Sequence, residues 1–199
     1  MGNEIPKQEH GSKMDAIAEI NLGAEVEAME FYQVARMRLL EVYNWDKICG
    51  YASATFILID ASGQELKRAA SEGDFIKIDI PGPGSTTGDG YDWVRVEQIH
   101  EESSEHNQMV SMRVRPCPNP MNESEEVAHF FKDEATSTFM VSRIGTEVLA
   151  EMHGRNEMAN TDSAGVIDRI RNVAVGLGAK IGFSYPQWKV LVESLVSRK

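Results

Sequence analysis

"DFIKIDIPGPGSTTGDGYDWVRVE", residues 74–97, places two alternating runs on either side of a loop that is rich in glycine and proline. Isoleucine occupies every second position of the first run, and Val94 and Val96 repeat this spacing in the second. A two-residue period is typical of strands that turn one face toward a core and the other toward solvent. We therefore predict two antiparallel strands joined by this loop.

The glycines of the loop raise the alternative of a phosphate-binding site. Such sites present backbone N–H groups at a helix N-terminus, and the P-loop adds a Gly-Lys-Ser/Thr sequence. No such sequence is present here, a strand is predicted after Gly90, and Asp89 and Asp92 would repel an anion. We favour a structured hairpin loop over a ligand loop.

The alternation recurs on both sides of this segment. Further strands are predicted at residues 53–60, 65–70, 109–115, 136–144 and 147–156. Gly145 and Thr146 separate the last two, a connection length that suits a second hairpin.

A helix is predicted between Asp15 and Glu41, before the first strand. Six positions follow the three-to-four-residue spacing of one helix face: Leu22, Val26, Met29, Gln33, Met37 and Leu40. Residues 1–13 are polar and are predicted to form a disordered lead-in.

Helices are also predicted toward the C-terminus. Residues 125–134 suggest a short helix within the strand region, and an apolar stripe runs from Val166 to Ile181. Ser184, with Gln187 three residues later, forms a capping box for a final helix.

The order of elements predicts an α+β domain. We expect a strongly bent antiparallel sheet or a small β-barrel of about seven strands, flanked by an N-terminal helix and two C-terminal helices. Closure is favoured because it removes exposed edges. The single domain is expected over residues 14–199, with helical residues 14–48, β-rich residues 52–156 and helical residues 162–198.

Composition and charge narrow the function classes. The chain of 199 residues is 42% hydrophobic and 26% charged, as in ordinary globular proteins. Its net charge of −11 argues against a broad basic surface for nucleic acid or anionic lipid. No apolar run is long enough to span a membrane and no secretory signal is evident, so we expect a cytoplasmic protein.

Cysteine and histidine usage predicts neither a disulfide framework nor a metal site. Cys49 and Cys117 belong to no Cys-x-x-Cys pair, so two reduced thiols are expected. His129 lacks the cysteine or aspartate partners that a metal site needs. We expect no metal and no cofactor.

Polar residues of "EVLAEMHGRNE", residues 147–157, form the first candidate site. At strand spacing, Glu151, His153 and Arg155 share one face with Glu147, and Glu157 joins them if the strand continues. Two carboxylates, an imidazole and a guanidinium suit general acid–base chemistry. We favour the alternative of a solvated face with cross-strand ion pairs.

A second candidate site combines Tyr91, Trp93, Arg95 and Glu97 of one strand with side chains of the neighbouring strand. Those side chains are Phe75, Lys77 and Asp79. Aromatic side chains interleaved with charges suit a ring-bearing or peptide ligand. We favour the alternative that the N-terminal or C-terminal helix packs over Trp93, because burying a large indole ring is favourable.

Several phrases of the chain are similar to those of a set of uncharacterised bacterial proteins. The phrases are "GDFIKIDIPGPG", "GDGYDWVRVE", "HFFKDEATSTF" and "HGRNE", within a likeness that spans roughly residues 36–195. The resemblance implies one genuine domain and assigns no activity, cofactor or catalytic residue.

Two hypotheses from different classes remain open. The first is a non-catalytic binding or protein-interaction module whose partly apolar helices recognise another protein or a second copy of the chain. The alternative is a small-molecule-binding protein or enzyme with a polar site around His153, Arg155 and Trp93. That alternative requires the three side chains to converge in one cleft.

Overall fold

The computed structural model describes residues 4–50, 54–79, 87–160 and 185–198. The elements follow in the order β1 (Ser12–Asn21), α1 (Glu25–Leu40), η1 (Val42–Asn44), α2 (Trp45–Cys49), β2 (Thr55–Ile59), β3 (Phe75–Asp79), β4 (Asp92–Ser103), β5 (Asn107–Pro116), β6 (Thr136–Ile144) and β7 (Glu147–Glu157). A C-terminal helix over residues 185–195 follows.

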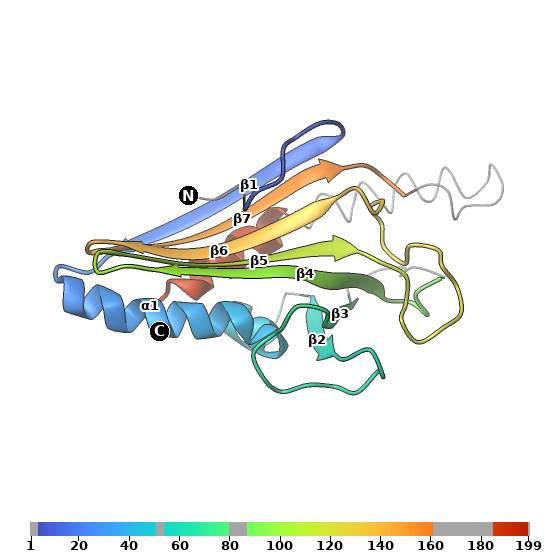
Figure 1. Cartoon of the computed structure of the whole chain (residues 1–199), viewed down its shortest axis with the longest axis horizontal. Coiled ribbons are helices and arrows are strands. Elements are labelled where there is room, and N and C mark those ends of the chain that lie inside the picture. The colour runs from blue at the N-terminus through green and yellow to red at the C-terminus, as the bar shows by residue number, and fades with distance from the viewer. Residues whose placement is uncertain (1–3, 51–53, 80–86, 161–184, 199) are drawn as a thin grey trace.

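The strands form one antiparallel sheet in the order β1-β7-β6-β5-β4-β3-β2. This confirms the predicted α+β class with seven strands. The sheet is open, with β1 and β2 at its two edges (Figure 1). The small closed barrel is therefore wrong: the first strand pairs with the last, but β2 remains at the far edge.

The predicted alternation of the central strands is confirmed. Ile76, Val94, Val96 and Val114 point to one face and are buried in the main core. We call this the inner face; α1 and the C-terminal helix contribute to the same core. Figure 1 shows α1 running along the sheet and the C-terminal helix behind the strands.

Four aromatic rings connect the helices to the inner face. Trp45 of α2 lies 5.2 Å from Phe56 of β2 and 4.9 Å from Phe139 of β6, between ring centroids. Trp188 of the C-terminal helix lies 5.2 Å from Phe139. Aromatic pairs at such distances add to the free energy gained from burying their area.

The predicted helix from Asp15 is wrong over its first part, because residues 12–21 form the edge strand β1. Ala16 lies opposite Met152 of β7, and polar Asp15 and Glu19 alternate with apolar neighbours. The sequence of this segment is compatible with a helix or a strand, and pairing with β7 selects the strand. The helix begins at Glu25, after Gly23 turns the chain with a φ of 46°.

The predicted buried face of α1 is also wrong. Val26, Met29 and Met37 are exposed, whereas α1 packs on the sheet through its opposite face. The buried residues of α1 are Ala28, Tyr32, Ala35, Leu39 and Leu40. The two alanines let the helix approach the sheet closely, which the bulkier stripe would prevent.

Other local predictions have mixed outcomes. Residues 125–134 form no helix and instead make isolated bridges, Pro118 with Val127 and Phe131 with Ala159. Residues 65–70 form a single bridge rather than a strand. The β6–β7 hairpin is confirmed, as is the antiparallel pairing of β3 with β4.

Several predictions lie outside the described residues: most of the glycine-rich loop, the apolar stripe of residues 166–181 and the Ser184 cap. The assignment of residues 14–199 to a single domain stays a prediction. Among the helices that are described, none combines the length and apolar character needed to cross a membrane.

Candidate functional site

The outer face of the sheet, opposite the helices, carries a row of polar side chains. Arg113 of β5, Thr138 of β6, His153 of β7 and Asp15 of β1 are successive cross-strand neighbours in this row. Their side chains fall on one face because each occupies a position between inward-pointing core residues.

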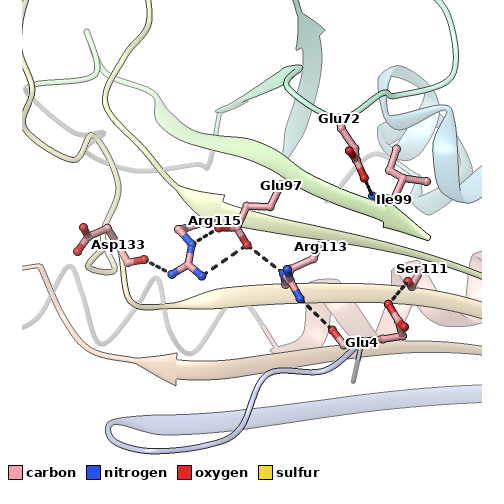
Figure 2. Close-up of polar contacts among 8 residues, drawn as sticks. All are labelled: Glu4, Glu72, Glu97, Ile99, Ser111, Arg113, Arg115 and Asp133. Carbon is pink, nitrogen blue, oxygen red and sulfur yellow. Dashed lines mark hydrogen bonds and ion pairs between the residues drawn. The ribbon is translucent and has the colours of Figure 1, made fainter. Parts of the chain in front are cut away.

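The N-terminal segment, residues 4–11, lies against this outer face, which differs from the predicted disorder. The hydroxyl of Ser111 donates to Glu4 Oε2 at 3.3 Å, and Arg113 donates to the carbonyl of Glu4 at 3.4 Å (Figure 2). Both anchors are on β5. The segment therefore begins above the middle of the sheet.

Asn156, at the end of β7, holds the other end of the segment. Its Oδ1 accepts hydrogen bonds from the backbone N–H of Glu9 at 2.8 Å and of His10 at 3.3 Å. Its Nδ2 donates to the carbonyl of Lys7 at 3.1 Å. Asn156 has a φ of 56°, in the left-handed region that asparagine tolerates better than most residues. The segment thus crosses β6 between its anchors on β5 and β7.

A pocket of about 780 Å³ opens on the outer face beside this segment. Its apolar lining comes from Ile5 of the segment and from Met109, Met140 and Ile144 of the sheet. Polar groups of the β4–β5 turn and of β6 complete the wall. Pockets of about 300–1,000 Å³ with mainly apolar linings are typical of small-molecule sites.

The charged groups of this pocket are mainly acidic. Glu4, Glu102 and Glu151 line it, and Arg143 is its one basic residue in the described chain. The guanidinium of Arg143 is engaged elsewhere: it donates to Gln108 Oε1 and to the carbonyls of Glu105 and Gly145, each at 2.8–2.9 Å. The carboxylates therefore dominate the field that a ligand would meet.

Two histidines stand beside these carboxylates. His100 Nε2 lies 3.1 Å from Glu102 Oε1 and 3.8 Å from Glu4 Oε1. The hydrogen bond with Glu102 raises the pKa of His100, with Glu4 adding to the effect. Protonation of His100 therefore makes the net charge beside the pocket less negative.

His153 is the second of these histidines and is buried. Its Nδ1 lies 2.6 Å from Asp15 Oδ1, and its Nε2 lies 3.5 Å from Glu151 Oε1. Burial opposes its charged form, but the carboxylates of Glu151 and Asp15 outweigh burial and raise the pKa of His153. Arg155 approaches the same oxygen of Asp15 at 2.7 Å, and the two cations hold the pKa of Asp15 below its usual value although burial opposes this.

The structure thus brings together part of the first predicted cluster. Glu151, His153 and Arg155 share the outer face, and their partner Asp15 comes from β1. Glu157, at the end of β7, interacts electrostatically with Arg155 and Asp15 of this cluster. It is buried, burial raises its pKa, and Ser12 donates a hydrogen bond to its carboxylate at 3.2 Å. The ligand-binding role of these residues stays a prediction.

Trp93 and Arg95 do not join that cluster. Both lie on β4, which β5 and β6 separate from β7. Trp93 is buried in a small cluster with Ile59 and Ala128, and its Nε1 donates to the carbonyl of Gly88 at 3.2 Å. The single cleft that would combine Trp93 with His153 and Arg155 is not formed.

Arg95 lines a second cavity of about 680 Å³, next to a network of charges. A β-bulge between Val96 and Gln98 places Glu97 between Arg113 and Arg115 (Figure 2). Burial opposes the charged form of Glu97, but these two arginines outweigh it and lower the pKa of Glu97. Glu97 neutralises much of the charge of the two arginines. We therefore assign this network a structural role, in which ion pairs hold β4 against β5, rather than a ligand-binding role.

Sequence reasoning predicted Glu151 as a site residue but missed the other residues that line the pocket. Met109 and Met140 lie at positions of β5 and β6 that alternate with core residues. The two-residue pattern could therefore have predicted that both side chains point to the outer face. Glu4 and Ile5 carry no such signal, because they belong to a polar segment that tertiary contacts place.

Metal and thiol chemistry receive no support from the described residues. No group of three or more potential ligands gathers there around a possible metal position. Cys49 and Cys117 are free thiols, and burial raises their pKa to about 11 and about 12. Neither cysteine is therefore activated as a nucleophile.

Comparison with known proteins identifies a fold rather than a family. No family model and no curated protein matches the chain. A hypothetical protein, jhp0584 from Helicobacter pylori, has a similar structure with a TM-score of 0.51 and 11% identity, covering 93% of this chain and 86% of its own. This likeness shows a helix-grip arrangement and agrees with the resemblance to uncharacterised bacterial proteins.

Two plant proteins give weaker structural matches. The major latex-like protein 151 of Panax ginseng has a TM-score of 0.38 and 14% identity, covering 88% of this chain and 99% of its own. Truncated norcoclaurine synthase from Thalictrum flavum has a TM-score of 0.37 and 11% identity, covering 98% and 100%. Scores this low support no argument about the function of this chain.

Proposed function

We propose that this protein is a binding module for a small amphiphilic molecule with a protonated amine. The site is the outer-face pocket between the N-terminal segment and strands β4 to β7. The observation that carries the proposal is the combination of an apolar floor with three carboxylates, Glu4, Glu102 and Glu151. Arg143, the basic residue of the lining, already makes three hydrogen bonds within the chain.

The floor suits an unbranched or irregular apolar group. Met109 and Met140 are long, flexible and polarizable side chains, which adapt to differently shaped ligands. Ile5 and Ile144 extend the apolar wall. An alkyl chain or ring lying on these residues would be removed from water, at a gain of about 25 cal/mol per Å² of apolar surface.

The carboxylates suit a cation at the polar end of the ligand. A primary ammonium group has three N–H donors and forms charge-assisted hydrogen bonds with carboxylates. One buried acceptor near the pocket, Thr138 Oγ1, makes no hydrogen bond within the described chain. Buried polar atoms of this kind are usually satisfied by water or a ligand.

Octylamine tests the proposal, with octanoate as the matched anion of the same chain length. We expect octylamine to bind in calorimetry and to shift the methyl NMR signals of Met109 and Met140. Glu151→Gln should weaken binding by about ten-fold or more, because it removes one charged hydrogen-bond acceptor. Met140→Gln should weaken it too, through the apolar floor.

Matched controls lie outside the pocket. Glu30→Gln removes one exposed carboxylate of α1, and Met121→Gln changes an exposed methionine; both should leave octylamine binding unchanged. Binding of octanoate as tightly as octylamine, or equal affinities for Glu151→Gln and Glu30→Gln, would overturn the proposal.

Amine binding should also depend on pH through the two histidines. Both have raised pKa values, so as pH falls each becomes charged beside a carboxylate of the pocket. The added positive charge opposes the ammonium group, and affinity for octylamine should therefore fall as pH decreases through the histidine titration. His100→Asn should flatten this profile in calorimetry; an affinity that rises toward acid pH would contradict it.

A further inference from the structure

The N-terminal segment is attached firmly to the sheet over residues 7–10. The Asn156 side chain makes three hydrogen bonds with backbone groups of this stretch, at 2.8–3.3 Å. The backbone N–H of Asn156 also donates to Gln8 Oε1 at 3.0 Å. Four hydrogen bonds with one residue of β7 therefore fix this part of the segment to the end of the strand.

The attachment at Glu4 is weaker. Glu4 accepts a hydrogen bond from Ser111 at 3.3 Å and another from Arg113 at 3.4 Å (Figure 2). Glu4 Oε1 also lies 3.8 Å from His100 Nε2. Strong hydrogen bonds span about 2.5–3.2 Å, so all three contacts are long. Residues 5–6 make no hydrogen bond within the described chain.

The weakly attached residues form one wall of the outer-face pocket. We call residues 4–6 the strap. Glu4 contributes a carboxylate to the pocket lining and Ile5 contributes an apolar side chain, whereas the other lining residues belong to strands β4 to β7 and the β4–β5 turn. A ligand in the pocket would therefore contact both of these strap groups only while the strap lies on the sheet.

We infer that the strap is a movable wall, which detaches from β5 at Glu4 while residues 7–10 stay fixed, and which closes on a bound ligand. A ligand that binds the closed state more tightly shifts the equilibrium toward that state by its difference in affinity. The closing of the strap on a ligand rests on the proposed function, whereas its detachment in the free chain does not.

Digestion of the folded full chain with a glutamate-specific protease tests the detachment. Cleavage after Glu4 requires that its carboxylate leave Ser111 and enter the protease, so the cleavage rate reports the detached state. Mass spectrometry distinguishes loss of residues 1–4 from loss of residues 1–9. We expect faster cleavage after Glu4 than after Glu9, because Asn156 holds the backbone on both sides of the second bond. Equal rates would overturn the inference.

A variant of the weak attachment sharpens this test. Ser111→Ala should speed cleavage after Glu4 at least about three-fold, because it removes one hydrogen bond to the carboxylate, and should leave cleavage after Glu9 unchanged. Ser62→Ala is the matched control: it removes a hydroxyl that donates to a carboxylate at 2.6 Å in an exposed loop, and it should change neither rate. Unchanged cleavage after Glu4 in Ser111→Ala, or equal acceleration of both bonds, would overturn the inference.

Octylamine tests the closing of the strap. At saturation it should slow cleavage after Glu4 at least about three-fold, relative to cleavage after the exposed Glu123, which corrects for any effect on the protease. Octylamine that binds in calorimetry without slowing this cleavage would overturn the closing. If octylamine does not bind, the proposed function fails, and the rates measured on the free chain still decide whether the strap detaches.

Discussion

Replacement of Arg143 by alanine should destabilise the protein by about 3–5 kcal/mol, because three hydrogen-bond acceptors lose their partner and each buried unpaired group costs about 1–3 kcal/mol. Arg143 is fully buried and its guanidinium joins two turns. It donates to Glu105 in the β4–β5 turn and to Gly145 in the β6–β7 turn, both at 2.9 Å, and to the side chain of Gln108 at 2.8 Å. Alanine would leave these acceptors unpaired and a cavity between the turns.

Urea unfolding measures this loss, with Arg36→Ala as the matched control. Arg36 forms a bidentate pair with Glu101, at 2.6 and 2.8 Å, but this pair lies at the surface. Removing it should cost less than about 1 kcal/mol, because solvent screens exposed ion pairs. Equal costs for Arg143→Ala and Arg36→Ala would show that Arg143 does not staple the two turns.

Replacement of Phe139 by alanine should cost about 3–5 kcal/mol and loosen the C-terminal helix. Phe139 is buried on the inner face of β6, between Trp45 of α2 and Trp188 of the C-terminal helix. The truncation leaves a cavity beside both tryptophans, which Phe56 also contacts, at 5.2 Å from Trp45 and 6.0 Å from Trp188. The C-terminal helix would then lose part of its packing contact with the sheet.

Hydrogen exchange of residues 185–195, measured together with urea unfolding, separates this effect from general destabilisation. Protection of the helix amides should fall more than that of β5 and β6. Phe139→Leu keeps most of the volume and should cost less than about 1.5 kcal/mol. Unchanged helix protection in Phe139→Ala would contradict the assigned role.

The polar cluster around His153 could be predicted from the sequence only in part. The pattern of β7 correctly placed Glu151, His153 and Arg155 on one face, because strand spacing alone decides this. It could not supply Asp15, which pairs with His153 and Arg155 from β1. It also joined Trp93 to the group, although two strands separate β4 from β7.

The sequence by itself determined which side chains of the central strands face inward. Ile76, Val94 and Val114 follow a two-residue period, and burying apolar area leaves one choice of face. The short connection between β6 and β7 likewise determined their hairpin, since two residues join only antiparallel neighbours.

Tertiary structure decided two features of residues 12–40: the strand at Ser12–Asn21 and the side of α1 that is buried. The segment around Ala16 suits either a helix or a strand, and pairing with β7 selected the strand. In α1, apolar residues line two sides of the helix, and the small side chains of Ala28 and Ala35 allowed one side to approach the sheet. Local sequence contains no information on such contacts, because they depend on the shape of a surface formed by strands far along the chain.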